Sequence, residues 1–215
     1  MDILDEIKED LRSEQAKKFW HNHGRHILAA VAILVLGTGL WSGLQQYNQH
    51  RAAIDSEKFS AAVQLADDQK RDQALAELAK ISNEAGAGYK TLALFSEANL
   101  QIKAGDNKAA AATFDRLADN RAIDPMYREL ATIYSANLQL DFPQPEFDKI
   151  FDRLQPLTAT GGAWRYSALE LQGLVRAQQG KKDEAAAIFA RLQADAQTPS
   201  GIKARAERWA SQLLF

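Results

Sequence analysis

Residues 105–117 read GDNKAAAATFDRL, and residues 180–192 read GKKDEAAAIFARL. In both stretches a glycine precedes a phenylalanine by nine residues, and an alanine precedes that phenylalanine by four. A further small residue, Ala98 or Gly173, lies seven residues before each glycine. Glycine can end a helix in a left-handed cap, and small residues let neighbouring helices pack closely. The pattern therefore predicts pairs of antiparallel helices, with the phenylalanine filling the space between pairs.

The end of each stretch belongs to a repeat that runs through the chain. Its copies are Leu78-Ala79-Lys80-Ile81, Phe114-Asp115-Arg116-Leu117, Phe151-Asp152-Arg153-Leu154 and Phe189-Ala190-Arg191-Leu192. The first residues of successive copies are 36, 37 and 38 residues apart. Residues 45–215 are rich in helix formers and lack the alternation typical of strands. The sequence therefore predicts an all-α domain of about four helix pairs.

These positions resemble tetratricopeptide repeats (TPR), which place a small residue, a glycine, an alanine and two large residues at fixed intervals. The residues that fit are Ala98, Gly105, Ala110, Phe114 and Leu117, then Gly173, Gly180, Ala185, Phe189 and Leu192, and in part Ala62, Ala74, Leu78 and Ile81. The third repeat departs from the pattern, because Phe147 replaces the alanine and residues 141–145 (DFPQP) replace the glycine turn. The resemblance implies a divergent TPR-like α-solenoid.

The helix pairs predicted from this register cover most of the chain after residue 49. They are 49–67 with 70–82, 87–104 with 107–119, 125–140 with 145–155, and 163–179 with 181–195. A last helix, ending near Leu214, is expected to cap the open end of the array, because the last repeat otherwise exposes its apolar side. Ile202, Ala206 and Trp209 share one face of that helix, so we expect Trp209 in the core.

Residues 27–44 (ILAAVAILVLGTGLWSGL) form an uncharged run of eighteen residues. As a helix it is roughly 27 Å long, close to the thickness of a bilayer core. The run predicts a single transmembrane helix between a tail, residues 1–26, and the TPR-like domain, residues 45–215. A cleaved signal peptide is the alternative, but the long leader and the lack of a suitable cleavage site favour an uncleaved anchor.

The distribution of basic residues predicts the orientation of this anchor. The tail carries Lys8, Arg12, Lys17, Lys18 and Arg25, whereas the twenty residues after the run carry only Arg51 and Lys58. Lys and Arg are retained on the cytoplasmic side of a membrane. We therefore expect a cytoplasmic tail and a domain outside, in the periplasm of a Gram-negative bacterium.

Gly39 and Gly43 lie one helical turn apart within the run. Small residues at this spacing let two helix backbones approach closely in lipid. We expect them to pack against another transmembrane helix, either that of a second copy in a homodimer or that of a partner.

The order of parts resembles one family across essentially the whole chain. A basic tail with the stretch Lys17-Lys18-Phe19-Trp20 and then Gly24 leads directly into the span and the repeats. This arrangement is similar to the ancillary SecYEG translocon subunit family (YfgM-like). The resemblance implies a bacterial inner-membrane protein at the Sec translocon, whose periplasmic domain helps to hand emerging chains to periplasmic chaperones. An envelope-assembly or cell-division scaffold, or a regulator of a wall hydrolase, is the alternative on the same architecture.

By analogy with the repeat family, the first helix of each pair lines an inner surface that binds a polypeptide. The predicted lining residues are Phe95, Asn99, Ile102, Lys103, Thr132, Ala136, Gln139, Glu170, Leu174 and Ala177. Of these, Asn99 alone matches the clamp that some such repeats use for C-terminal carboxylates.

Catalysis by cysteine or histidine is not expected in the outer domain. The chain has no cysteine, and it has no histidine after His50. These absences argue against Ser–His and Cys–His catalysis and against histidine metal sites there. His21, His23 and His26 lie before the span without a visible ligand frame. Residues 45–215 carry 21 basic and 22 acidic residues, which gives no electrostatic footprint for nucleic acid.

A pair of carboxylates is the remaining catalytic option. Asp148 and Asp152 are four residues apart and follow Glu146, and glycoside hydrolysis needs two carboxyl groups about 5–10 Å apart. Lys149 and Arg153 lie beside them, so solvated ion pairs are the favoured interpretation. We therefore expect a protein that is not an enzyme and that has no cofactor and no metal.

Overall fold

A computed structural model describes the backbone of residues 3–213 and the side chains of residues 34–213, with those of Lys17, Trp20 and His26. The chain divides into two compact units, Met1–Arg51 and Ala52–Phe215. The described residues form helices joined by turns and contain no strand, which confirms the prediction of an all-α fold for this part of the chain. Helix α1 (Ile3–Asp67) supplies residues 3–51 to the first unit and residues 52–67 to the second.

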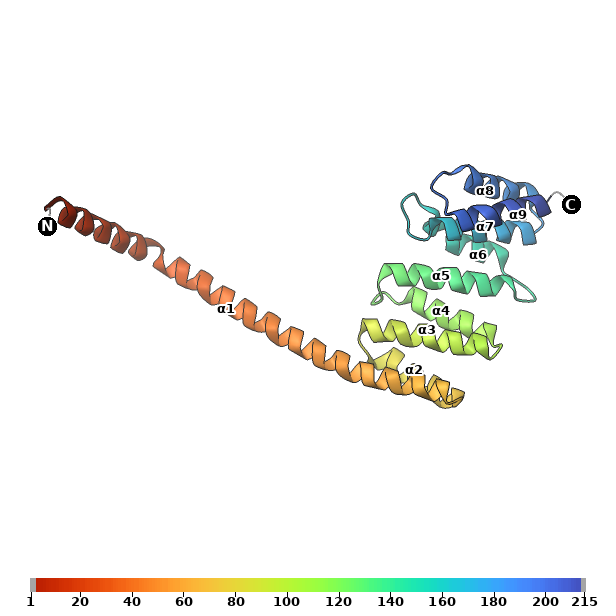
Figure 1. The fold of residues 1–215 in the computed structure, drawn as a ribbon, viewed down its shortest axis with the longest axis horizontal. Helices are drawn as coiled ribbons and strands as arrows, with labels where there is room; N and C mark the ends of the chain where they lie inside the picture. Colours follow the sequence, from red (N-terminus) through yellow and green to blue (C-terminus); the bar gives the residue numbers. More distant parts are fainter. Residues whose placement is uncertain (1–2, 214–215) are drawn as a thin grey trace. The chain divides into compact units, whose positions relative to one another are not determined.

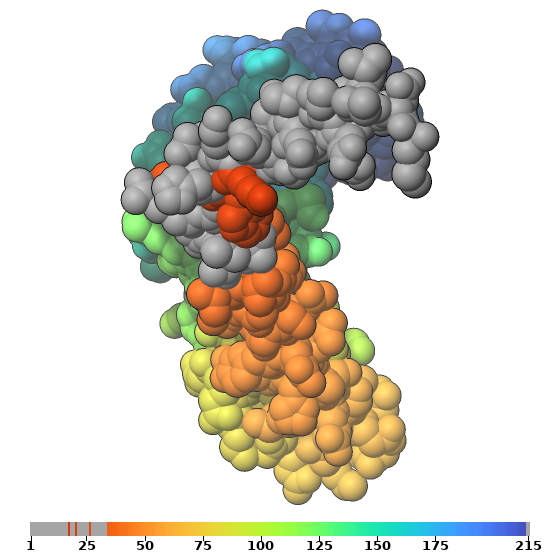
Figure 2. Space-filling view, turned by 90° about the vertical axis from the view of Figure 1, so that its left-hand side faces the viewer, coloured from red at the N-terminus to blue at the C-terminus, as the bar shows by residue number. Residues whose placement is uncertain are grey.

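The second unit is a stack of helical hairpins in chain order (Figure 1). Its helices after α1 are α2 (Arg71–Glu84), α3 (Ala87–Lys103), α4 (Asn107–Asp119), α5 (Pro125–Leu140), α6 (Phe147–Leu154), α7 (Arg165–Gln178), α8 (Lys182–Ala194) and α9 (Ser200–Gln212), with a 3₁₀ turn η1 (Gln155–Thr158). Figure 2 shows the same order on the surface, from yellow through green to blue. The predicted TPR-like solenoid with a capping helix is the observed architecture.

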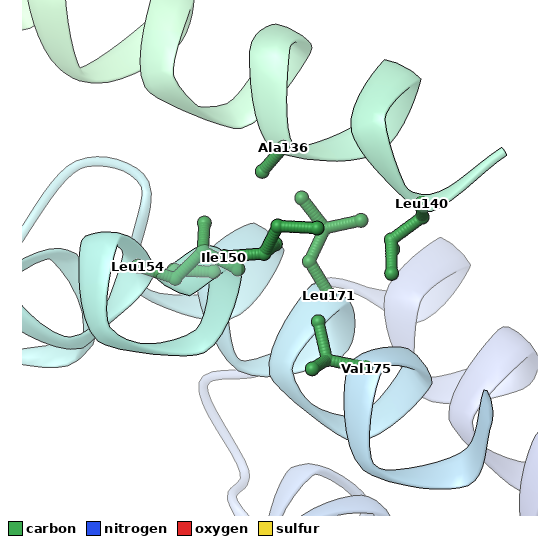
Figure 3. Close-up of a cluster of buried hydrophobic side chains, with 7 residues drawn as sticks. Ala136, Leu140, Ile150, Leu154, Leu171 and Val175 are labelled. Atoms are coloured by element: carbon green, nitrogen blue, oxygen red, sulfur yellow. The ribbon is translucent and has the colours of Figure 1, made fainter. Parts of the chain in front are cut away.

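Each repeat buries a cluster of apolar side chains between its two helices and the helix that follows them. In the second and fourth repeats these clusters contain Phe114 and Phe189, which are almost fully buried as the repeat pattern predicts. Figure 3 shows the cluster of the third repeat, in which Leu140, Ile150 and Leu171 come from α5, α6 and α7. Burying such side chains is worth about 1.5–3 kcal/mol each, so apolar contact between hairpins dominates the stability of the array.

Three turns between paired helices have the same backbone geometry. Gly105 and Gly180 have φ of +79° and +82°, and Gln69 has φ of +62° in the equivalent position of the first repeat. In each turn the amide of the following residue donates to the carbonyl five residues earlier, at 2.9 Å. This pattern is a Schellman cap, which glycine adopts without the steric cost that Cβ imposes. Gln69 therefore occupies a glycine position.

We expect Gln69→Gly to stabilise the protein by about 1 kcal/mol. A residue with a Cβ costs roughly 1–2 kcal/mol in the left-handed conformation, and the larger loss of conformational freedom that glycine undergoes on folding offsets part of the gain. The measurement is the urea midpoint of the full-length chain. Gly180→Gln places a residue with a Cβ in the left-handed conformation of the equivalent turn, so it should lower that midpoint by a similar amount. A Gln69→Gly protein with an unchanged or lower midpoint would show that the turn is unstrained.

The arginine of two repeat tetrads joins its hairpin to the preceding one. Arg116 on α4 donates from Nη2 to Ser82 Oγ on α2 at 3.3 Å, and Arg153 on α6 donates from Nη2 to Asp119 Oδ1 on α4 at 3.0 Å. Both acceptors lie 34 residues earlier in the chain. The tetrads thus link successive second helices, in addition to supplying the buried Phe and Leu.

The third repeat departs from the predicted boundaries. Its second helix, predicted over residues 145–155, is α6, which has eight residues and passes into the 3₁₀ turn η1. Pro156 explains the change, because it has no N–H to continue the ladder of α-helical hydrogen bonds. Gly161 then adopts φ of +85°, and α7 begins at Arg165, two residues later than predicted.

The prediction that Trp209 lies in the core is wrong. Ile202 and Ala206 are buried against α7 and α8, but Trp209 is 38% exposed. It lines a cavity of about 240 Å³ together with Leu174 and Leu213. Because α9 is the last helix of the array, it packs on one side only. Ala210 packs against the apolar cluster on that side, and Trp209 does not.

Among the residues that the structure describes, no helix combines the length and apolarity needed to cross a membrane. The side chains of residues 27–33, which begin the predicted span, lie outside the described residues. Leu36, Leu40 and Leu44, in the described part of the run, are all exposed. The transmembrane helix over residues 27–44 stays a prediction.

Candidate protein-interaction site

A cavity of about 460 Å³ lies between the start of α3 and the start of α5. Its lining is mainly apolar and contains one acidic residue. The lining residues are Ala87, Gly88, Tyr89, Thr91, Leu92, Phe95, Asp124 and Tyr127. A volume of several hundred Å³ is typical of ligand sites, and an apolar lining with a few polar groups is their usual composition.

Aromatic rings from three helices meet beside this cavity. The ring of Phe95 on α3 contacts Phe114 on α4 and Tyr127 and Tyr134 on α5, with centroids 5.8, 6.4 and 6.4 Å apart. All three contacts are edge-to-face, the arrangement that the ring quadrupoles favour. Phe114 is buried, so it anchors the cluster to the core and holds Phe95 in place at the surface.

Large apolar side chains are exposed around the cavity. Leu92, Met126, Tyr127 and Tyr134 are 48%, 47%, 42% and 46% exposed. Leu92 and Tyr127 line the cavity, Met126 precedes Tyr127 in the chain, and the ring of Tyr134 contacts that of Phe95. Single exposed apolar residues are common, but a group of four such residues in this region is a patch of the kind that marks interaction sites. We call this set, with Phe95 and the cavity, the α3–α5 groove.

Of the predicted lining residues on α3, Phe95 lies in the α3–α5 groove. Asn99, Ile102 and Lys103 are exposed one and two turns further along the same helix. They are not among the residues that line the cavity. The structure therefore brings one of the four predicted α3 residues to the site.

The predicted residues on α5 are used in packing between helices. Thr132 is buried and its hydroxyl donates to the Arg128 carbonyl at 3.1 Å. Gln139 donates from Nε2 to Asp115 Oδ2 on α4 at 3.2 Å and to Ser135 Oγ at 2.8 Å. Ala136 is buried and belongs to the core cluster of the third repeat. Gln139 and Ala136 thus join α5 to its neighbours, whereas the hydroxyl of Thr132 bonds within α5.

The predicted residues on α7 lie near α9. Glu170 is buried, and its carboxylate forms a two-pronged ion pair with the guanidinium of Arg205, with Nη2 2.7 Å from Oε2. The hydrogen bond to Glu170 raises the pKa of Arg205 above its ordinary value. Leu174 and Ala177 line the smaller cavity beside Trp209. The predicted set is therefore divided between the α3–α5 groove, interhelical packing and this second cavity.

Gly39 and Gly43 lie on α1, and space is open where each would carry a Cβ. Their predicted packing against another transmembrane helix stays a prediction. Of the histidines beside the predicted span, His21 and His23 lie outside the described side chains. Among the described residues, no three side chains of the metal-binding types form a group that could hold an ion.

The carboxylates considered for catalysis lie on α6. Asp148 Oδ1 accepts from Gln179 Nε2 at 3.2 Å and from Arg176 Nη1 at 3.0 Å. These two hydrogen bonds, that of Gln179 first, lower the pKa of Asp148. An ionised carboxylate held in this way has no proton to donate near neutral pH, so the geometry favours the ion-pair interpretation over a general acid.

Sequence reasoning missed Leu92, Tyr127 and Tyr134 in the α3–α5 groove. Tyr127 and Tyr134 are seven residues apart, which places them on one face of a helix two turns apart. That spacing, and the placement of Leu92 almost one turn before Phe95, were the available signals. The repeat register alone did not point to the two tyrosines on α5, because the third repeat lacks the glycine turn that sets the register in the second and fourth repeats.

Comparison with known families gave one match. The sequence model of the family described as a tetratricopeptide repeat-like domain matches residues 17–205. The matched range includes the whole predicted anchor as well as the helix pairs. Searches among curated proteins and among solved structures gave no match.

Proposed function

Because this chain belongs to the tetratricopeptide repeat-like family, we propose that it works as a membrane-anchored protein-interaction scaffold. It binds a segment of another polypeptide in the α3–α5 groove. The observation that carries this proposal is the cavity of about 460 Å³ between α3 and α5, with a ring cluster on its wall and exposed apolar side chains around it. Burying apolar surface is the main driving force of most protein association.

The membrane anchor is part of the same proposal. Its support is the uncharged run of residues 27–44, the excess of Lys and Arg before it, and the family match that begins at Lys17. The leucines of the described part of the run are exposed, as side chains that face lipid would be. The anchor holds the repeat domain in the periplasm, close to its partners.

The resemblance to ancillary SecYEG translocon subunits supplies the proposed partners. These are translocon subunits on one side and periplasmic chaperones on the other, with the groove receiving segments of emerging chains. The alternative is an envelope-assembly or cell-division scaffold, which would use the same groove for a different partner.

Site-specific photo-crosslinking in living cells tests both the groove and the partners. A photoreactive amino acid placed at Leu92 or Tyr127 should give crosslinks to translocon subunits, chaperones or newly exported chains, identified by mass spectrometry. The matched control is Ala112, which is exposed on α4 and does not line the cavity. Ala112 should give at least about tenfold less product, the ratio expected from roughly 1.4 kcal/mol of preference for the groove.

The identity of the crosslinked proteins decides between the two candidates. Translocon and chaperone peptides support the first, whereas division or wall-synthesis proteins support the alternative. Crosslinks to cytoplasmic proteins would contradict the proposed orientation. Equal yields from Ala112 and Leu92 would contradict the assignment of the groove as the binding site.

A further inference from the structure

Asp124 is the single charged residue among the described residues that line the cavity of the α3–α5 groove. It caps the start of α5, where its Oδ1 accepts from the backbone N–H of Met126 at 2.8 Å. Within the described part of the chain, Oδ2 of Asp124 makes no hydrogen bond, and the residue is exposed. An apolar cavity thus holds one carboxylate with a free oxygen.

The aromatic rings of the same cavity add negative potential. Phe95 and Tyr127 both line it, with centroids 6.4 Å apart and planes at 72°, and Tyr89 lines it as well. The face of an aromatic ring attracts a cation, and the interaction strengthens when the cation is removed from water. The rings and the carboxylate therefore favour the same sign of charge in an occupant.

The start of α3 favours negative charge in an occupant, the opposite of the rings and Asp124. Ala87 and Gly88, which begin that helix, also line the cavity, and Gly86 before them provides no side-chain cap. A helix N-terminus carries roughly half a positive charge, and its free N–H groups favour carbonyl or carboxylate oxygens. The full charge of Asp124 exceeds this partial charge, and the free N–H groups can donate hydrogen bonds to a backbone carbonyl of a peptide.

We propose that the cavity takes the side chain of an arginine or lysine from an extended segment of the bound polypeptide. This proposal rests on the proposed function of the α3–α5 groove and names the class of segment it selects. The cation lies against the rings of Phe95 and Tyr127 with its charge toward Asp124, and apolar neighbours in the segment contact Leu92. Arginine is preferred to lysine, because a guanidinium is planar, stacks on rings and is more weakly hydrated.

Two peptide pools test this selectivity. One pool has a single arginine among randomised apolar and small residues, and the other has citrulline, its neutral isostere, at the same place. Binding of the fluorescent pools to the full-length chain in neutral detergent is measured by anisotropy. We expect the arginine pool to bind about tenfold more tightly, the sum of a partly desolvated cation–π contact and an exposed ion pair.

Asp124→Asn is the informative variant, because asparagine caps a helix about as well as aspartate and only the charge is lost. It should reduce the preference for arginine to about twofold, which the rings alone would provide. The matched control is Asp106→Asn, another exposed N-cap, whose Oδ1 accepts from Ala109 N–H at 3.0 Å outside this cavity. Asp106→Asn should leave the tenfold preference unchanged.

The outcomes separate this proposal from the proposed function. Equal binding of the two pools, tighter binding of the citrulline pool, or a preference that Asp124→Asn does not change would overturn the cationic selectivity and leave the groove as a peptide site. Failure of both pools to bind, or binding that Leu92→Glu leaves unaltered, would overturn the groove itself and with it this proposal.

Discussion

Gly173→Ala is expected to destabilise the protein by about 2 kcal/mol, the middle of the range for overpacking a core. The reason is that a Cβ on Gly173 would lie 2.5 Å from Cε1 and 2.7 Å from Cζ of Phe189. Helix propensity predicts the opposite sign, a gain of about 0.8–1 kcal/mol for alanine within α7. The measurement is the free energy of unfolding of the full-length chain in urea.

A second substitution shows whether the ring of Phe189 causes this loss. Phe189→Leu removes the two ring atoms nearest to the new Cβ and keeps an apolar side chain in the core. In that background Gly173→Ala should be neutral or stabilising, so the two substitutions should couple by about 2 kcal/mol. Additive effects of the two substitutions would show that the close approach of α7 and α8 does not depend on this contact.

Arg205→Met is expected to cost about 2 kcal/mol. It leaves the Glu170 carboxylate, whose side chain is 10% exposed, without its partner on α9. Removing one partner of a buried ion pair costs roughly 3–5 kcal/mol, and the value here is lower because the Arg205 side chain is 45% exposed and its site is partly solvated. Hydrogen exchange of the α9 amides should accelerate more than exchange of the α3 amides.

The double variant Glu170→Leu/Arg205→Met is the control for this effect. An apolar pair of similar size removes the unpaired charge, and replacing a buried ion pair in this way is often neutral. The double variant should therefore regain most of the stability that Arg205→Met loses. If it is as unstable as the single variant, the loss comes from packing of the arginine stem and not from the buried carboxylate.

Repetition in the sequence predicts most of the fold. Phe114 and Phe189 are buried where the repeat pattern places them, and Gly105 and Gly180 have the left-handed conformation that a helix cap requires. The turn at Gln69 shows the limit of this approach. Glutamine carries no signal for a left-handed turn, so its role follows only from the register of the neighbouring repeats.

The candidate site was less predictable, because spacing identifies a helix face but not the neighbours of that face. Thr132 and Gln139 occur at the expected spacing, yet their polar groups bond within α5 and to α4. Glu170 likewise pairs with Arg205, which is 35 residues away in the sequence. Contacts between residues so far apart depend on packing that a single sequence does not specify.

The tetrad arginines have a mechanical consequence. Arg116 and Arg153 fasten successive second helices to one another through polar bonds, whereas α3 and α5 meet through ring contacts and shared apolar packing. Ring contacts can slide over a short distance at little cost, while a hydrogen bond to a charged group is lost when it stretches. We therefore expect the array to flex mainly by small separations of α3 and α5 beside the α3–α5 groove. The second helices that Arg116 and Arg153 join should keep their spacing.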